Sequence, residues 1–495
     1  FAEMLLLLVL AASGLFYYIF SFYRDVARYP KGPTPIPFLG NVHQLTKGKL
    51  YQDMERFAAE YGSIFTVFMP VPIVVITEYE AVREAFVQHG DDFSARPENV
   101  VNDALQYMPN GGVINSNGES WREQRRTAIS ILRDFGMGKN LMEEKVKESI
   151  REYLRCLADI KDKDRVDLRW PIQLMIANII NETLFGFKYA YDDCERLIDY
   201  VEGFNKFLME LSETKLLFLP MKFPWVKHIP YIGYHALTKH SNNIKCMNRY
   251  IEEECERSTK TFSEDEESNC FVHSYLQRMP SNALLTPDQL IATCADFFVA
   301  GQETTTTTLR WAMLFLADNQ EAQEKVRAEI LAVVGRSRLP SMADKPKMPY
   351  TSATVLEIQR RANILAGNVI HVATADVVIK GVNIPAGSYI NGDIHFILAN
   401  DPIFKNPKEF RPERYLKEDG KTLNKEAVEH TIPFSLGKRQ CAGEALARVE
   451  LFLGLAATLQ HYRILPPIDG TPVNLEPQYY QIHLPNPQKL QLIPV

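Results

Sequence analysis

One cysteine lies among residues that suit it to bind a metal. Cys441 directly precedes a stretch with helical periodicity, where unpaired backbone N–H groups and the helix dipole favour a thiolate. Gly437 permits a tight turn before the cysteine, and Gly443 lets a flat ligand lie close to the helix. Arg439 can direct a positive charge toward an anionic group on that ligand. The loop therefore suits a sulfur ligand under a planar, negatively charged metal complex.

Haem with an axial cysteine thiolate fits this description best. The alternative for any single cysteine is a structural role, which we expect for the remaining members of the set of 7. Their odd number and the absence of a C-x-x-C pair argue against a disulfide framework and against a zinc ribbon. We therefore expect the chain to work in a reducing compartment.

A second unusual group lies in the middle of a long expected helix. Thr286 and Pro287 form an N-terminal capping sequence, and the helical pattern continues to Asn319. At its centre A-G-Q-E-T runs from Ala300 to Thr304, and more threonines follow. Glycine and β-branched residues are poor choices for a helix interior. A local rule broken inside a core helix indicates function, although residues 306–308 could simply form a packing face.

Two further sets of side chains have a spacing that brings them together. Trp121 and Arg125 are four residues apart and share one face of an expected helix. Glu357 and Arg360 are three residues apart and can pair in the same way, and Arg414 supplies a second arginine downstream. Alone, such pairs are common and contribute little to stability.

The residues from Phe434 to Gly443 match F-x-x-G-x-R-x-C-x-G at every defined position, and here the chain resembles cytochrome P-450 monooxygenases. The resemblance extends over essentially the whole chain and looks like the microsomal branch that metabolises drugs and lipids. It implies a mainly α fold, the cytochrome P-450 fold, in which a large helical domain carries small β-sheets. It also implies haem b (iron protoporphyrin IX) bound by Cys441 as the metal ligand, with O₂ as co-substrate.

The resemblance assigns roles to the other residues. A-G-x-[DE]-T implies a groove for O₂ at Ala300, with Thr304 and Glu303 relaying protons. The remaining cofactor-binding positions that it implies are Arg439, Phe434 and Gly443 in the loop, Trp121 and Arg125 as donors to a haem propionate, and Arg96 and His371 as further propionate partners. Glu357, Arg360 and Arg414 would form a buried structural network on the haem side of the core.

The chain departs from the family pattern at two places. Its proline-rich stretch reads P-K-G-P from Pro30 to Pro33, where relatives have P-P-G-P. After Arg360, relatives commonly have prolines where this chain has Ala366 and Ile370. In the family that segment lines the substrate pocket, so the shape of the wall over residues 366–374 stays open.

The elements that must hold these residues are mostly helical. Helical periodicity covers residues 50–61, 81–89, 121–132, 141–160, 242–258, 286–319, 320–334 and 442–461. Strand patterns are short: 65–68, 73–77, 377–379, 389–391 and a C-terminal hairpin formed by 481–484 and 490–493. The sequence has neither G-x-G-x-x-G after a strand nor G-x-x-x-x-G-K-[ST], so it shows no nucleotide or flavin motif.

The N-terminal segment has the composition of a membrane span. Residues 4–22 carry no charge, and a helix of this length reaches about 28 Å, close to the hydrocarbon thickness of a bilayer. Aromatic residues and then Arg24, Arg28 and Lys31 follow, which places the rest of the chain in the cytosol. A cleaved signal peptide is the alternative, but its basic flank would precede the apolar stretch. We expect an anchor over 1–23 in the endoplasmic reticulum membrane, a proline-rich hinge over 24–40 and one domain over 41–495.

Composition excludes several classes of protein. Of the 495 residues, 46% are hydrophobic and 23% are charged, which argues against a disordered, a collagen-like and a polytopic membrane protein. The formal charge of -6 leaves no basic excess to neutralise phosphates, so we expect no nucleic-acid partner.

The resemblance implies electrons from NADPH through a separate NADPH–cytochrome P-450 reductase, with cytochrome b5 as a second donor. A candidate docking face around Cys441 consists of Arg122, Arg126, Arg133, Lys139 and Lys438, and a solvated charged surface is its alternative. The apolar, proline-rich residues 216–234 suit a membrane-dipping entrance for a lipophilic substrate, with a core-packed connector as the alternative. Steroid, fatty acid and xenobiotic stay open as substrates.

Three other functions stay open at this stage. One is a haem-thiolate isomerase or dehydratase that acts without a reductase, against which the Glu303-Thr304 pair argues. Another is a non-catalytic membrane protein that binds haem or sterol. A cysteine hydrolase is more distant, because no histidine is near Cys441 in the sequence.

Overall fold

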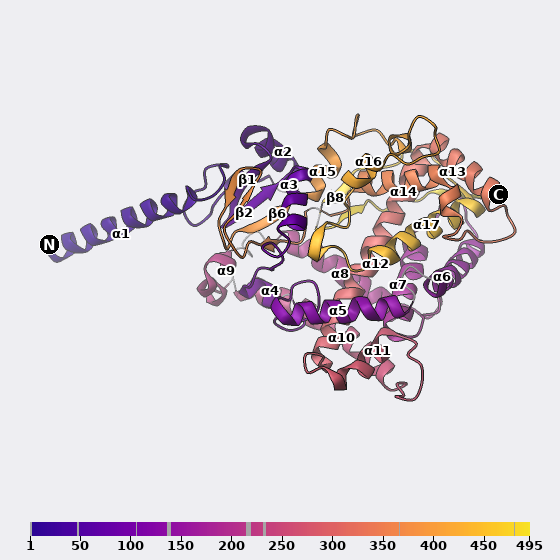
Figure 1. Ribbon diagram of the computed structural model, residues 1–495, viewed down its shortest axis with the longest axis horizontal. Coiled ribbons are helices and arrows are strands. Elements are labelled where there is room, and N and C mark those ends of the chain that lie inside the picture. Colours follow the sequence, from indigo (N-terminus) through magenta and orange to yellow (C-terminus); the bar gives the residue numbers. More distant parts are fainter. Residues whose placement is uncertain are drawn as a thin grey trace.

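The computed structural model describes residues 2–46, 49–104, 106–135, 140–213, 219–230, 234–365, 367–479 and 481–495. Lys139, Ala366 and positions 216–218 and 231–233 of the candidate entrance lie outside the described residues. Helices form most of the body, the sheet that contains β1, β2 and β6 lies at one end of it, and the first helix projects from that end (Figure 1). The mainly α fold expected from the sequence is therefore confirmed.

The bounds of the elements follow the chain. The helices are α1 (Ala2–Val26), α2 (Leu50–Tyr61), α3 (Tyr79–Arg83), α4 (Val100–Ala104), α5 (Gly118–Asp134), α6 (Asn140–Asp159), α7 (Arg169–Phe185), α8 (Glu195–Glu213), α9 (Leu219–Lys222), α10 (Tyr234–Thr259), α11 (Phe271–Arg278), α12 (Pro287–Asp318), α13 (Gln320–Val333), α14 (Pro349–Ala362), α15 (Ile394–Asn400), α16 (Lys425–His430) and α17 (Glu444–His461). The strands are β1 (Ile64–Met69), β2 (Val71–Ile76), β3 (His371–Val372), β4 (Val377–Ile379), β5 (Val382–Ile384), β6 (Tyr389–Gly392), β7 (Tyr462–Leu465), β8 (Pro477–Tyr479), β9 (His483–Pro485) and β10 (Gln491–Pro494).

Some of the strands that pair in the sheets are distant from each other in the sequence. The largest sheet has the order β1-β2-β6-β3, in which β2 and β6 run parallel. The predicted C-terminal hairpin is wrong, because β9 pairs with β8 and β10 pairs with β7 instead of with each other. Strands as short as these are stabilised by whatever packs beside them, so β9 pairs with the preceding β8, whereas β10 pairs with the more distant β7.

Helix α12 crosses the centre of the body and positions the site. Its N-terminus is capped as predicted, because the Thr286 side chain accepts a hydrogen bond from the backbone N–H of Gln289 and Pro287 follows. The helix packs against α7, α10, α14 and α17. At Gly301 a Cβ atom would lie 2.7 Å from Ile180 Cδ1, so the glycine permits α7 to approach closely.

The first helix is joined to the body by aromatic contacts. The ring of Tyr18 stacks on Phe38 at 4.7 Å, and Phe22 lies 6.3 Å from Phe68 of β1. Phe38 in turn lies 5.8 Å from Phe223, next to α9. Residues 3–26 form the one helix of the described chain that is long and apolar enough to cross a membrane.

A buried ion cluster joins α14 to the segment that follows α15. Glu357 bonds Arg360 through both carboxylate oxygens, at 2.8 and 2.9 Å, and its Oε2 lies 3.0 Å from Arg414 Nε. All three side chains are almost fully buried. The network expected from the resemblance is therefore confirmed, and one carboxylate compensates two buried guanidinium groups.

We predict that Glu357→Gln lowers the free energy of unfolding by about 3–5 kcal/mol, because it leaves two buried cations without a counter-ion. Urea unfolding followed by circular dichroism measures the loss. Glu321→Gln is the matched control, since Glu321 makes an exposed pair with Lys325 at 2.8 Å and its loss should cost at most about 1 kcal/mol. Equal losses in the two variants would contradict the role given to the cluster.

Candidate active site

An apolar cavity of about 320 Å³ lies between α12, α17 and the loop before α17. Cys441, Thr304 and Ala300 line it together, and most of the other side chains in its wall are aliphatic or aromatic. Of the predicted site residues, Arg96, Arg125, Phe434, Arg439 and Gly443 also line it. Side chains spread over the sequence therefore meet around one enclosed space.

The loop before α17 holds Cys441 by backbone contacts. The Cys441 N–H donates to the carbonyl of Phe434 at 3.0 Å, and the side chain, which is exposed, lines the cavity. Burial raises the pKa of the Cys441 thiol, while the backbone N–H groups of Gly443 and Glu444 lower it. Gly437 has a φ of 77°, and a Cβ there would collide with the carbonyl oxygen of Phe86. The space beside Gly443 is open, because a Cβ there would meet nothing within 4 Å.

Three guanidinium groups gather beside the cavity; those of Arg96 and Arg439 are buried and that of Arg125 is partly buried. Arg439 donates to the carbonyls of Ser94 and Ser116 at 2.7 and 2.5 Å, and its Cζ lies 3.7 Å from the centre of the Trp121 ring. Burial and the neighbouring cations lower the pKa of Arg439 to about 8. Burial and Arg125 lower the pKa of Arg96 to about 9. None of the three forms an ion pair with a described carboxylate.

Two aromatic nitrogen atoms near these cations are also buried without a partner. Trp121 Nε1 and His371 Nε2 have none among the described residues. His371 Nδ1 bonds the carbonyl of Phe93 at 2.6 Å, so Nε2 is the atom left for another group. Burial, followed by Arg96, lowers the pKa of His371 well below its usual value. The proton of neutral His371 lies on Nδ1, so Nε2 is an acceptor, and the orphaned donor is Trp121 Nε1. That donor, the uncompensated cations and the sulfur facing the cavity fit haem, whose carboxylates would satisfy the indole and the cations.

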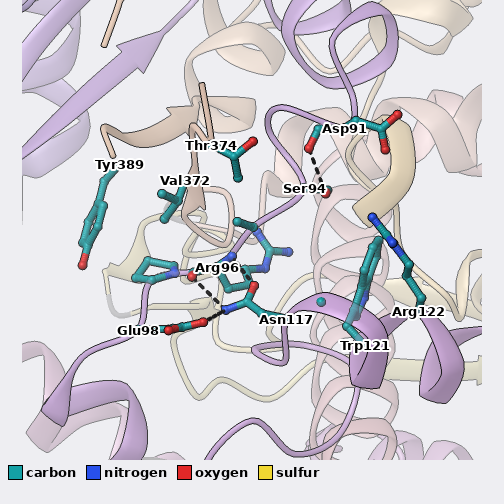
Figure 2. A pocket seen from close by; sticks show the side chains of 13 residues that line it. Asp91, Ser94, Arg96, Glu98, Asn117, Trp121, Arg122, Val372, Thr374 and Tyr389 are labelled. Carbon is teal, nitrogen blue, oxygen red and sulfur yellow. Dashed lines mark hydrogen bonds between the residues drawn. The ribbon is translucent and has the colours of Figure 1, made fainter. Parts of the chain in front are cut away.

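An outer pocket of about 640 Å³ adjoins the cavity and shares Arg96 with it. Figure 2 shows Arg96, Asn117 and Trp121 in its wall, with Asn117 between Arg96 and Glu98. The Asn117 amide donates to the carbonyl of Arg96 at 3.1 Å and to Glu98 at 3.0 Å. Arg96 of the cation cluster thus lies directly in the wall of this pocket.

Threonine hydroxyls of α12 donate hydrogen bonds to backbone carbonyls one turn earlier in the same helix. Thr304 Oγ1 donates to the carbonyl of Ala300 at 2.6 Å, and Thr308 Oγ1 donates to that of Thr304 at 2.8 Å. Such bonds to the carbonyl four residues earlier bend a helix. Both hydroxyls lie in the cavity wall.

Glu303 points elsewhere, although it is adjacent to Thr304. Its side chain is fully buried, accepts from Thr307 Oγ1 at 3.2 Å and does not line the cavity. Burial raises the pKa of Glu303, and Arg310 and Arg169 oppose that rise. Successive residues on a helix point about 100° apart, so the carboxyl lies behind the groove.

Sequence reasoning missed two acidic residues of the cavity wall. Asp296 on α12 accepts the backbone N–H groups of Val113 and Ile114 at 2.7 and 2.8 Å and so ties the loop before α5 to α12. Burial raises the pKa of Asp296 to about 6. Glu450 lies on α17. In each case, the sequence feature that could have indicated the residue was a single acidic side chain inside an apolar stretch of helix.

A basic groove of about 630 Å³ lies on the surface near the cysteine loop. Its cationic wall residues are Arg122, Arg125, Arg126, Arg133 and Lys438. Two of the charges are partly compensated, because Lys438 pairs with Asp91 and Arg126 lies 2.7 Å from Glu123. Arg125 reaches both the groove and the cavity, where it donates to the carbonyl of Gln440 at 2.5 Å.

The chain resembles known proteins along nearly its whole length. Residues 30–493 match the family model described as Cytochrome P450. The chain is 35% identical over 500 residues to cytochrome P450 2C28 of Mesocricetus auratus, covering 97% of this chain and 98% of that protein. It is 34% identical over 477 residues to cytochrome P450 2H2 of Gallus gallus, with 94% and 93% covered. Cytochrome P450 2C3 of Oryctolagus cuniculus is 33% identical over 475 residues, with 94% of each chain covered.

We predict that Gly437→Ala destabilises the protein by about 3 kcal/mol, because the new Cβ collides with Phe86 and must displace the cysteine loop. Gly420→Ala is the matched control, since Gly420 also has a positive φ of 65° but has open space around its Cβ position. That variant should cost only about 1 kcal/mol. Urea unfolding midpoints compare the two, and equal shifts would exclude the collision.

Proposed function

Because the chain belongs to the cytochrome P450 family and is therefore a haem-thiolate monooxygenase, we propose that it inserts one atom of O₂ into a lipophilic substrate. The enzyme uses haem ligated by a cysteine thiolate, O₂ and electrons derived from NADPH. We assign the thiolate to Cys441. The observation that carries this assignment is the single apolar cavity shared by the Cys441 sulfur and the Thr304 hydroxyl.

Bound haem supplies the activation of O₂ and the transfer of electrons to it. The residues of the chain hold the cofactor and move protons. Arg96, Arg125 and Arg439 would neutralise the carboxylates of haem, and Trp121 would donate a hydrogen bond to one of them. His371 would be a further partner of a propionate when its Nε2 carries a proton. Phe434 and Gly443 shape the loop around Cys441, and Ala300 forms part of the distal wall beside Thr304.

Proton delivery falls to the hydroxyl of Thr304 with Glu303 behind it. Burial favours the protonated form of Glu303, so the carboxyl can hold a proton near the groove at neutral pH. Thr304 lines the cavity and can pass a proton inward, since its hydroxyl both donates and accepts.

The substrate class that we propose is lipophilic, whether steroid, fatty acid or xenobiotic. The cavity wall is mainly apolar, which favours burial of a ligand of that kind. The described part of the candidate entrance, residues 219–230, includes Trp225 at 62% exposure, which argues against a core-packed connector. Phe38, at 51% exposure, lies beside it on the same end of the body as α1.

We also propose that residues 1–23 anchor the protein in the endoplasmic reticulum membrane, with residues 24–40 as hinge and residues 41–495 as the cytosolic catalytic domain. The length and apolar character of α1 support the anchor. The exposed aromatic side chains near Phe38 and Trp225 would then meet the same lipid surface. A lipophilic substrate would enter directly from the bilayer.

The electron donor that we propose is the NADPH–cytochrome P-450 reductase, with cytochrome b5 as a further partner. The basic groove beside the cysteine loop supports this assignment, since it can bind an acidic partner close to Cys441 despite the net negative charge of the chain. Lys139, part of the docking face expected from the sequence, lies outside the described residues.

The reduced carbon-monoxide difference spectrum tests the assignment of the ligand. The wild type should show the red-shifted band of a thiolate-ligated haem, and Cys441→Ser should lose it. Cys246→Ser is the matched control, because Cys246 is exposed and away from the cavity, and it should keep the band. Reconstitution with reductase and NADPH, using testosterone, lauric acid and 7-ethoxycoumarin, then tests the reaction. No hydroxylation of any of the three would count against the proposed substrate class.

We predict that Arg126→Glu with Arg133→Glu raises the apparent KM for reductase roughly tenfold, because two charges in the groove reverse sign. The expected kcat at saturating reductase is close to that of the wild type. Arg155→Glu with Lys161→Glu is the matched control, since both side chains are exposed and lie outside the groove. Unchanged kinetics of the groove variant would remove the docking assignment.

A further inference from the structure

Glu450 is a buried carboxyl that the reaction described so far does not use. It lies on α17, is 2% exposed and lines the cavity that holds Cys441 and Thr304. Its neighbours in sequence, Val449 and Leu451, are apolar. Its Oε1 has no hydrogen-bond partner among the described residues. An unpaired buried oxygen costs about 1–3 kcal/mol, so packing does not explain a glutamate here.

The surroundings of Glu450 keep it protonated. Burial raises the pKa of Glu450 to about 8, and the hydroxyl of Thr305 on α12 opposes the rise by bonding to the carboxyl. The described helices packed against α17 are α6, α12, α13 and α14, and none contributes a charged group to this pKa. A carboxyl so placed holds its proton at neutral pH and can donate it.

The other carboxyls near the centre of α12 are placed differently. Glu303 faces away from the cavity, toward Thr307 and Arg310. Asp296 lines the cavity, but its Oδ2 is committed to two backbone N–H groups of the loop before α5. Glu450 alone of the three combines a position in the cavity wall with an unpaired oxygen and a contact to a threonine next to Thr304.

We propose that Glu450 is a second proton donor of the reaction, acting through Thr305 in the cavity wall beside Thr304. The O–H bond of the Glu450 carboxyl breaks, Thr305 Oγ takes that proton and releases its own to the cavity, and Glu450 remains as a carboxylate. The carboxylate regains a proton from water before the next turnover. No electron moves in this step, and the protons are those that the reduction of O₂ consumes. The inference rests on the proposed proton-relay function of Thr304.

Infrared spectroscopy of the haem-loaded enzyme tests the proton on Glu450 without turnover. The wild type should show a protonated carboxyl band that disappears as the pH rises through about 8 and that Glu450→Gln lacks. Thr458→Val is the matched control, because Thr458 is a buried hydroxyl on the same helix, bonded to the carbonyl of Gly454 and outside the cavity wall. It should keep the band. Absence of such a band from the wild type would overturn the proposal.

The same carboxyl predicts a pH dependence of stability. The folded pKa of Glu450, about 8, lies above the ordinary 4.5 of the unfolded chain, so its contribution is complete below 4.5 and is lost as the pH rises through 8. The free energy of unfolding should therefore fall less steeply between these values in Glu450→Gln than in the wild type. Thr458→Val should lower stability at every pH and keep the wild-type slope.

Measurements of turnover distinguish a proton donor from a residue that has only a structural role. In Glu450→Gln the ratio of product formed to NADPH oxidised should fall several-fold, and the solvent isotope effect on kcat should increase. Glu450→Asp should restore part of the ratio, and Thr458→Val should keep it. The substrate is whichever of testosterone, lauric acid and 7-ethoxycoumarin the wild type hydroxylates fastest. A wild-type ratio and isotope effect in Glu450→Gln would exclude the role, whereas inactivity of the wild type toward all three would count against the proposed function instead.

Discussion

Arginine side chains with no carboxylate partner among the described residues gather beside the cavity of this molecule. Arg96, Arg125 and Arg439 lie together beside the cavity, and backbone carbonyls supply much of their hydrogen bonding. Carbonyl dipoles only partly replace the hydration of a guanidinium group, so the arrangement stays costly until an anion joins it. The loop of Cys441 and the segment of Arg96 are both held by these contacts.

The two faces of helix α12 lie in different chemical environments. Thr304 and Thr308 line an apolar cavity, whereas Glu303 lies among polar side chains behind them. Gly301 lets Ile180 of α7 pack close to the same turn, so this part of α12 is confined by its neighbours. The opposite wall contributes Glu450 from α17, the helix that follows the cysteine loop. Glu303 and Glu450 thus approach the threonines of α12 from two sides.

Local sequence patterns predicted the site better than they predicted the pairing of strands. The ten-residue pattern around Cys441 and the cap at Thr286 depend on neighbours in the chain, and both have counterparts in the structure. The direction of Glu303 depends on how α12 is rotated in the core, which no motif states. The pairing of β10 with β7, rather than with the neighbouring β9, depends on distant packing in the same way.

Helix α7 was missed for a related reason. Nearly every residue from Pro171 to Phe185 is buried, so the stretch has no polar face and no amphipathic period. The Glu357 network was predicted only through the resemblance, because Glu357 and Arg414 are separated by more than fifty positions. What the sequence leaves open is the set of contacts that form only when distant segments meet.

The aromatic contacts between α1 and the body restrict how the catalytic domain can swing about its proposed anchor. Tyr18 on Phe38 and Phe22 near Phe68 form two attachment points, and two points oppose rotation where a single flexible link would not. With α1 in a bilayer, the basic groove would then stay at a nearly constant height and tilt above the lipid. An electron donor confined to the same membrane would search for it by lateral diffusion in two dimensions, already close to the correct orientation.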